Sequence, residues 1–162
     1  MSNFCHLHAH SSYSFLDGYG LPIEIARRVA ELGHTAAAIT DHGNLFSNHP
    51  WARACAEVGI KPIYGVEAYI VPTIKEKKQR VDGKKGANAY NHITLLAKNE
   101  VGYRNLLRLN RISFTEGFYY KPRIDEEVLF RYQDGVIVLS GCVIGCPSQL
   151  LFHRGQDAAL DW

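Results

Sequence analysis

Short apolar runs that alternate with amphipathic stretches are the feature that most limits how this chain can fold. Residues 35–40 and 135–139 are apolar runs of strand length, and each ends in a polar turn. Residues 22–32 and 101–112 carry apolar side chains at helical spacing. Strands that alternate with helices over short connections are typical of a mostly parallel sheet or barrel covered by helices. We therefore expect one α/β domain over residues 1–162.

The same patterns predict further elements. Alternating side chains from Phe4 to His10 indicate a first strand that presents His8 and His10 on one face, and a polar turn follows at residues 17–20. We also expect helices at about 50–58 and 125–132, strands at 61–71 and 93–97, buried strands at 35–40 and 135–139, and a helix from Pro147 to Trp162. Gly65 indicates a bend or bulge in its strand.

Composition excludes several classes of protein. A net charge of +2 is too small to indicate a nucleic-acid binder by itself. The 4 cysteines include no CxxC pair and do not form a dense secreted scaffold, so reduced thiols and a cytoplasmic location are expected. The N-terminus does not have the pattern of a signal peptide, and no apolar stretch has the length needed to cross a bilayer, so no membrane partner is expected.

Metal-binding side chains lie near the ends of several predicted strands. His8 and His10 end the first strand, Asp41 and His42 follow the second, and Cys142 follows the last. Functional groups in βα folds collect at the C-terminal ends of strands. Two histidines two positions apart on a strand point the same way at about 7 Å, which suits two neighbouring ions or one ion bound from two sides. Taken together, these placements predict a metal site.

Glu67 and His92 extend this donor set, although the sequence leaves the direction of the strand after His92 open. Mixed nitrogen, oxygen and sulfur donors suit Zn²⁺ first, with Mn²⁺, Fe²⁺ and Mg²⁺ as alternatives. Clustered ions can activate water and clamp a phosphodiester. Each residue taken alone has a structural alternative: Asp41 begins a turn, Glu67 forms a salt bridge, or Cys142 is a buried apolar side chain.

Four motifs resemble those of the polymerase and histidinol phosphatase (PHP) superfamily. They are His8-Ala9-His10-Ser11-Ser12-Tyr13-Ser14, Ile39-Thr40-Asp41-His42-Gly43-Asn44, Gly65-Val66-Glu67 and His92-Ile93-Thr94-Leu95-Leu96. The resemblance implies a distorted βα barrel with a multinuclear metal centre. The metal ligands that it implies are His8, His10, Asp41, His42, Glu67, His92 and Cys142. Among these we expect Asp41, His42 and Glu67 to be catalytic.

Longer segments are similar to the PHP domain at the N-terminus of bacterial DNA polymerase III alpha subunits. These segments are Leu96–Glu100, Gly102–Leu106 and Glu116–Asp125, which histidinol phosphatases lack. The similarity implies as partners the rest of a polymerase chain, a primer 3′ end, an exonuclease subunit and a sliding clamp. The family's last Asp-x-His pair has no counterpart after Cys142. We therefore expect a barrel that is incomplete at its C-terminus, with one weakly held metal and little nuclease activity.

Three functions fit these features. The first is metal-dependent phosphodiester hydrolysis, as a 3′–5′ proofreading exonuclease or a pyrophosphatase, within a DNA-directed DNA polymerase. The second is a structural module whose metal braces the polymerase and which docks an exonuclease partner. The third is a free-standing PHP phosphatase, which the polymerase-type segments disfavour. The multinuclear donor set favours the first, because a structural site needs only one ion.

Contacts with DNA or phosphate are expected from a few polar side chains, namely Ser14, Lys121 and Arg123. Residues 118–123 interleave aromatic rings with cations, as single-strand binders do, or else form a packed loop. The lysine-rich residues 75–85 either contact phosphates or form a solvated loop.

Overall fold

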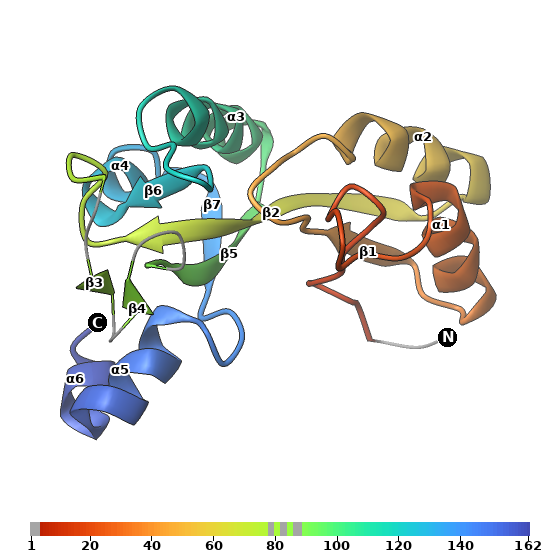
Figure 1. The fold of residues 1–162 in the computed structure, drawn as a ribbon. Coiled ribbons are helices and arrows are strands. Elements are labelled where there is room, and N and C mark those ends of the chain that lie inside the picture. The colour runs from red at the N-terminus through yellow and green to blue at the C-terminus, as the bar shows by residue number, and fades with distance from the viewer. Residues whose placement is uncertain (1–3, 78–79, 82–83, 86–88) are drawn as a thin grey trace.

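The computed structural model describes residues 4–77, 80–81, 84–85 and 89–162. Its helices are α1 (Pro22–Glu31), α2 (Asn48–Val58), α3 (Glu100–Thr115), α4 (Glu126–Arg131), α5 (Cys146–Arg154) and α6 (Gln156–Leu160). Its strands are β1 (Ala36–Ile39), β2 (Lys61–Val71), β3 (Arg80–Val81), β4 (Lys84–Lys85), β5 (Asn91–Ala97), β6 (Arg123–Asp125) and β7 (Val136–Leu139). Figure 1 shows this arrangement.

The long strand β2 organises the main sheet. The strand order is β1-β2-β5-β7, with β6 also paired to β2 (Figure 1). Strands β1 and β6 run parallel to β2, whereas β5 is antiparallel to β2 and β7 is antiparallel to β5. The α/β class is confirmed, but the expected mostly parallel sheet is wrong. No helix lies in the described parts of the connection from β2 to β5, and a parallel return needs a long crossover that is usually helical.

The N-terminal segment runs beside β1 without forming a regular strand. His6 makes a single parallel bridge with Ala37, and the Ala9 carbonyl accepts a hydrogen bond from Thr40 N at 2.8 Å. The Ala9 amide donates instead to the Thr40 hydroxyl at 3.2 Å. The expected strand from Phe4 to His10 is therefore wrong in extent, because a side chain replaces one backbone partner of the ladder.

Two glycines, Gly155 near the C-terminus and Gly65 in β2, account for further differences between the expected and the observed elements. Gly155, with φ of 90°, divides the expected C-terminal helix into α5 and α6. Gly65 pairs with Leu96 in the continuous register of β2 and β5, so the expected bend or bulge does not interrupt this ladder. A side chain at Gly65 would meet the Leu95 carbonyl oxygen at 2.6 Å. The glycine therefore allows a close approach of two backbones.

Strand β7 lies at an edge, where the apolar run had indicated a buried strand. Its only paired neighbour among the described residues is β5, and Ile137 and Val138 are each 42% exposed. An apolar run cannot distinguish a central strand from an edge strand, because both satisfy the same pattern.

Two apolar clusters support the sheet. Helices α1 and α2 pack on β1 around the fully buried Trp51. Helix α3 packs on β2, β5 and β6 through Leu106, Leu109 and Ile112. Strand β2 connects the clusters, since Tyr64 packs against the first and Val66 belongs to the second. Within the described ranges, no helix has the length and apolar character needed to span a membrane.

Candidate metal centre

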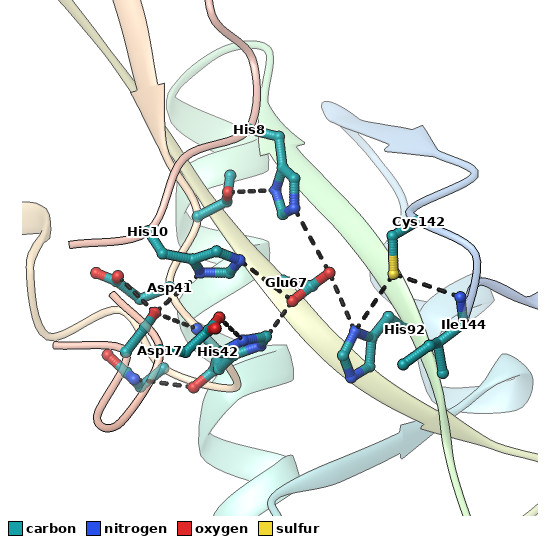
Figure 2. A network of polar contacts seen from close by, with 12 residues as sticks. His8, His10, Asp17, Asp41, His42, Glu67, His92, Cys142 and Ile144 are labelled. Carbon is teal, nitrogen blue, oxygen red and sulfur yellow. Dashed lines mark hydrogen bonds and ion pairs between the residues drawn. The ribbon is translucent and has the colours of Figure 1, made fainter. Parts of the chain in front are cut away.

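The carboxylate of Glu67 lies at the centre of four imidazoles (Figure 2). Its Oε2 lies 2.6 Å from His42 Nδ1 and 3.5 Å from His10 Nε2. Its Oε1 lies 3.1 Å from His92 Nδ1 and 3.5 Å from His8 Nε2. The Glu67 residue is only 1% exposed. Imidazoles gathered around a buried carboxylate form the donor set of a divalent metal site.

Strand directions explain how distant segments meet here. His42 lies three residues beyond Ile39, the last residue of β1, and bridges Glu67 in the parallel register of β1 and β2. His92 pairs with Tyr69, two residues beyond Glu67 and therefore on the same face of the sheet. Because β5 is antiparallel to β2, its first residues lie at the same end of the sheet as the last residues of β1. This direction, which the sequence left open, brings His92 into the cluster.

Asp17 joins the cluster, although its segment was expected to be only a polar turn. Its Oδ2 lies 2.7 Å from His42 Nε2. Three overlapping groups could each hold an ion: His8, His10 and Glu67; His10, Asp17 and His42; and His42, Glu67 and His92. The available sequence signal was the position of Asp17 in the loop that directly follows the His8-Ala9-His10 motif.

Asp41 points away from the imidazoles (Figure 2). Its Oδ1 accepts hydrogen bonds from Ser11 N at 2.7 Å and Ser14 Oγ at 2.8 Å, and its Oδ2 accepts from Ser11 Oγ at 2.8 Å. It belongs to none of the three groups. The structure therefore does not support the expected ligand and catalytic roles of Asp41. The buried carboxylate instead anchors the loop that carries His10 and Asp17.

Ser14 orients the cluster rather than facing a phosphate, because it is only 1% exposed. Its hydroxyl donates its one proton to Asp41, which can only accept, and accepts from His42 N at 3.0 Å. His10 Nδ1, at 2.9 Å from the same oxygen, must then be a donor. The proton on Nδ1 leaves the lone pair of His10 Nε2 directed at the cluster, as a metal ligand requires.

Cys142 and Lys121 lie at the margin of the centre. Cys142 Sγ is 3.8 Å from His92 Nδ1 and accepts a hydrogen bond from Ile144 N at 3.4 Å. It is beside the cluster but in none of the three groups. Lys121 Nζ lies 5.4 Å from the centroid of the Tyr69 ring. Its side chain lines an open groove together with His42 and His92.

Arg123 does not reach the site, so the expected phosphate contact is wrong. It is 1% exposed, and its Nε donates to the Gly117 carbonyl at 2.9 Å. Its guanidinium lies over the Tyr119 ring at 5.2 Å. Burial lowers the pKa of Arg123. Backbone carbonyls and an aromatic ring therefore take the place that a phosphate was expected to fill.

The lysine-rich loop is described only in part. Lys75 Nζ pairs with Glu127 at 3.1 Å, and Lys77 Nζ donates to the carbonyls of Glu116 and Phe118. The expected phosphate contacts of Lys78 and the residues after it fall outside the described side chains.

The side chains of the cluster shift one another's pKa values. Burial alone would raise the pKa of Glu67, but its contacts with His42 and His92 outweigh burial and hold that pKa well below its usual range. Contact with Glu67 raises the pKa of His42, whereas burial lowers the pKa of His10. Glu67 is therefore ionised, and a cation that binds here competes with a proton on His42.

The geometry of the cluster fits a metal ion. Glu67 Oε2 and His42 Nδ1 are buried and 2.6 Å apart, yet neither atom has a partner in good hydrogen-bond geometry. Buried polar atoms without such a partner require an explanation, and an ion that both atoms ligate supplies one. Among the residues that the structure describes, six side chains have donor atoms placed to ligate an ion here: His8, His10, Asp17, His42, Glu67 and His92.

Comparison with known proteins identifies the family of this chain. The family model of the PHP domain matches residues 6–162. This chain belongs to the PHP domain family. The PHP domain is 46% identical over 158 residues to the DNA polymerase III subunit alpha of Borreliella burgdorferi, covering 97% of this chain and 14% of that protein. It is 40% identical over 162 residues to the corresponding subunit of Aquifex aeolicus, covering 99% of this chain and 14% of that one.

A solved structure also resembles the PHP domain. An amidohydrolase from Chromobacterium violaceum, with bound sulfate and no metal, aligns at a TM-score of 0.44 and 23% identity. The alignment covers 67% of this chain and 34% of the amidohydrolase.

Replacing Ser14 tests how this PHP domain orients His10. In Ser14→Ala, His10 Nδ1 and the His42 amide lose their shared acceptor, so we expect metal affinity to fall about 10- to 100-fold. Isothermal titration with Mn²⁺ or Zn²⁺ measures this change. Ser12→Ala, an exposed serine in the same loop, is the matched control and should bind as the wild type does. Equal affinities for Ser14→Ala and Ser12→Ala would contradict the orienting role.

Proposed function

We propose that this chain binds divalent metal ions and hydrolyses phosphodiesters. The observation that carries the proposal is the buried Glu67 carboxylate, which faces four imidazoles from three parts of the fold. A divalent cation bound there would polarise a phosphoryl oxygen and supply an activated water. Zn²⁺ and Mn²⁺ are the metals that we propose first, with Fe²⁺ and Mg²⁺ as alternatives, because the donors are mainly imidazole and carboxylate.

The side chains of the chain itself would hold the ions and keep their ligands in place. Glu67, His10 and His42 each belong to two of the three ligand groups, which suits ions held close together. Ser14 fixes the proton of His10, and Thr40 Oγ1 lies 2.6 Å from His8 Nδ1. Lys121 at the groove wall is placed to attract a phosphate.

We further propose that the chain acts within a bacterial replicative DNA polymerase. The similarity to polymerase III alpha subunits supports this role, although the chain spans about one seventh of their length. On this proposal the substrate is a primer 3′ end and the location is cytoplasmic. The partners are the rest of the polymerase, an exonuclease subunit and a sliding clamp.

A structural role is the alternative, in which the metal braces the fold and the surface docks an exonuclease. A free-standing phosphatase is less well supported, because the similarity to polymerase subunits extends over nearly the whole chain.

Release of nitrophenol from bis(p-nitrophenyl) phosphate tests hydrolysis. The assay uses protein in excess over substrate, so that a low rate is also measured. We expect release that requires Mn²⁺, stops on addition of a chelator and is lost in His42→Gln. His153→Gln, an exposed histidine on α5, is the control. Bound metal without release would favour the structural role, and release that survives chelation would come from another site or protein.

A further inference from the structure

Three phenylalanine rings form a row beside the metal centre. The ring centroids of Phe46 and Phe114 lie 6.1 Å apart, and those of Phe114 and Phe118 lie 6.3 Å apart. Phe46 precedes α2, Phe114 is in the last turn of α3, and Phe118 lies in the loop that follows. Their exposed fractions are 61%, 39% and 48%. Tertiary structure has thus gathered exposed aromatic rings from separate segments, which indicates a binding surface.

The row begins in the groove that contains the candidate ligands. Phe46 and Phe114 line this groove, which has a volume of about 490 Å³. Asp17, His42 and His92 line the same groove. A chain bound along the phenylalanines would therefore have one end beside the metal centre.

The rim of the groove has the properties of a ligand-binding loop. Phe15 and Leu16 line it and are 86% and 93% exposed. Leu16 has φ of 71°, a conformation that costs free energy for a residue other than glycine. Strained backbone of this kind is concentrated at ligand clamps and active sites.

Positive charges lie at both ends of the row. Lys121 lines the groove at the metal end. At the outer end, Lys77 Nζ donates to the carbonyl oxygens of Glu116 and Phe118 at 2.9 and 3.0 Å. These neutral acceptors hold the ammonium in place without cancelling its charge. Aromatic rings between cations complement bases between phosphates, whereas an apolar protein segment would leave the cations without counterparts.

We propose that Phe46, Phe114 and Phe118 form a stacking track that binds the bases of single-stranded nucleic acid and directs its end to the metal centre. The second part rests on the proposed function, whereas base binding by the track does not require hydrolysis.

Fluorescence anisotropy with labelled oligonucleotides tests the track. The probes are an oligothymidylate of about 12 nucleotides and an abasic oligomer with the same number of phosphates, both in chelator to prevent cleavage. The wild-type chain should bind the abasic oligomer at least about tenfold more weakly, because it offers no base to stack. Phe114→Leu and Phe46→Leu should each weaken oligothymidylate binding about tenfold, and Phe114→Trp should retain it.

Phe130→Leu is the matched control, since Phe130 lies on α4, is 63% exposed and does not line the groove. Thermal unfolding shows whether each variant folds. If Phe114→Leu does not fold, the binding of Phe46→Leu still tests the proposal. Wild-type affinity in both leucine variants would overturn the track. Equal binding of the two probes would overturn it as well. Unchanged DNA binding combined with lost binding to another polypeptide would identify a protein-docking surface instead.

Hydrolysis of bis(p-nitrophenyl) phosphate, which carries no nucleobase, separates the two proposals. His42→Gln should lose this hydrolysis, whereas the control Phe130→Leu, which does not line the groove, should retain it. Track-dependent DNA binding without any hydrolysis would leave the track standing and refute the proposed hydrolytic function. Metal-dependent hydrolysis together with DNA binding that does not change in the track variants would support the hydrolytic function and refute the track.

Discussion

Glu67→Gln is expected to lower metal affinity by more than about 100-fold. Loss of a residue that only orients a ligand costs about 10- to 100-fold, and Glu67 belongs to two candidate ligand groups. An amide also removes the negative charge that offsets a divalent cation among imidazoles. Isothermal titration and elemental analysis after purification without chelator measure the loss.

The same variant should be stabilised much less by metal than the wild type. Metal at about 1,000 times its dissociation constant stabilises a folded chain by about 4 kcal/mol, or about 8–16 °C for a chain of this size. The wild-type melting temperature should rise with Mn²⁺ or Zn²⁺ and fall with chelator. In Glu67→Gln the shift should be at most about a third as large, because a 100-fold lower affinity leaves metal at about 10 times its dissociation constant.

Two variants serve as controls for the Glu67 experiment. Glu57→Gln removes an exposed carboxylate that pairs with Arg27, and its metal affinity should match the wild type. Asp41→Asn tests whether Asp41 anchors its loop or ligates the metal, because an amide can retain part of the hydrogen bonding to Ser11 and Ser14. We expect Asp41→Asn to keep most of its metal affinity. A loss of metal affinity equal to that of Glu67→Gln would show that Asp41 is a ligand and would refute its role as an anchor.

Gly102→Ala is expected to destabilise the fold by about 2 kcal/mol, although helix propensity predicts the opposite sign. Alanine in a helix is favoured over glycine by about 1 kcal/mol. A methyl group at Gly102 of α3, however, would lie 1.8 Å from the carbonyl oxygen of Gly135. Both sides of this contact are backbone, so relief requires α3 and the turn before β7 to separate, and overpacking of this kind costs about 3 kcal/mol.

Chemical denaturation measures the free energy of unfolding of Gly102→Ala. Val101→Ala is the control in the same turn of α3, because Val101 is 54% exposed and its replacement should change stability by less than about 0.5 kcal/mol. A Gly102→Ala variant as stable as the wild type would show that α3 can shift at little cost. Since β7 leads to Cys142, we also expect the thiol of this variant to be less well placed beside His92.

Much of the fold could be predicted from local patterns. Helix α1 begins at Pro22 and ends before Gly33, whose φ of 75° suits glycine, and α2 ends at Gly59 in the same way. Strand β2 has the predicted bounds, 61–71. These features depend on residues close in sequence, so propensity and periodicity determine them. The three-residue strand β6 was not predicted, because pairing with β2 rather than its own pattern makes it a strand.

The sequence by itself determined which side chains could form a site, because the His8-Ala9-His10, Asp41-His42 and Gly65-Val66-Glu67 motifs hold their donors at fixed positions on or beside strands. Only the tertiary structure decided which of them meet. Asp17 faces His42 while Asp41 turns toward Ser11 and Ser14, since loop closure, not spacing, sets which carboxylate reaches the imidazoles.

Strand direction and burial were likewise set by the tertiary structure and not by local sequence. His92 enters the cluster because β5 runs antiparallel to β2. Arg123 does not face the groove as a phosphate contact, because the carbonyls of Gly117 and Lys77 accept hydrogen bonds from its guanidinium. The row of Phe46, Phe114 and Phe118 could not be predicted as a unit, since Phe46 is far along the chain from Phe114 and Phe118. Local chemistry thus fixes the available groups, whereas packing over long sequence separations fixes their partners.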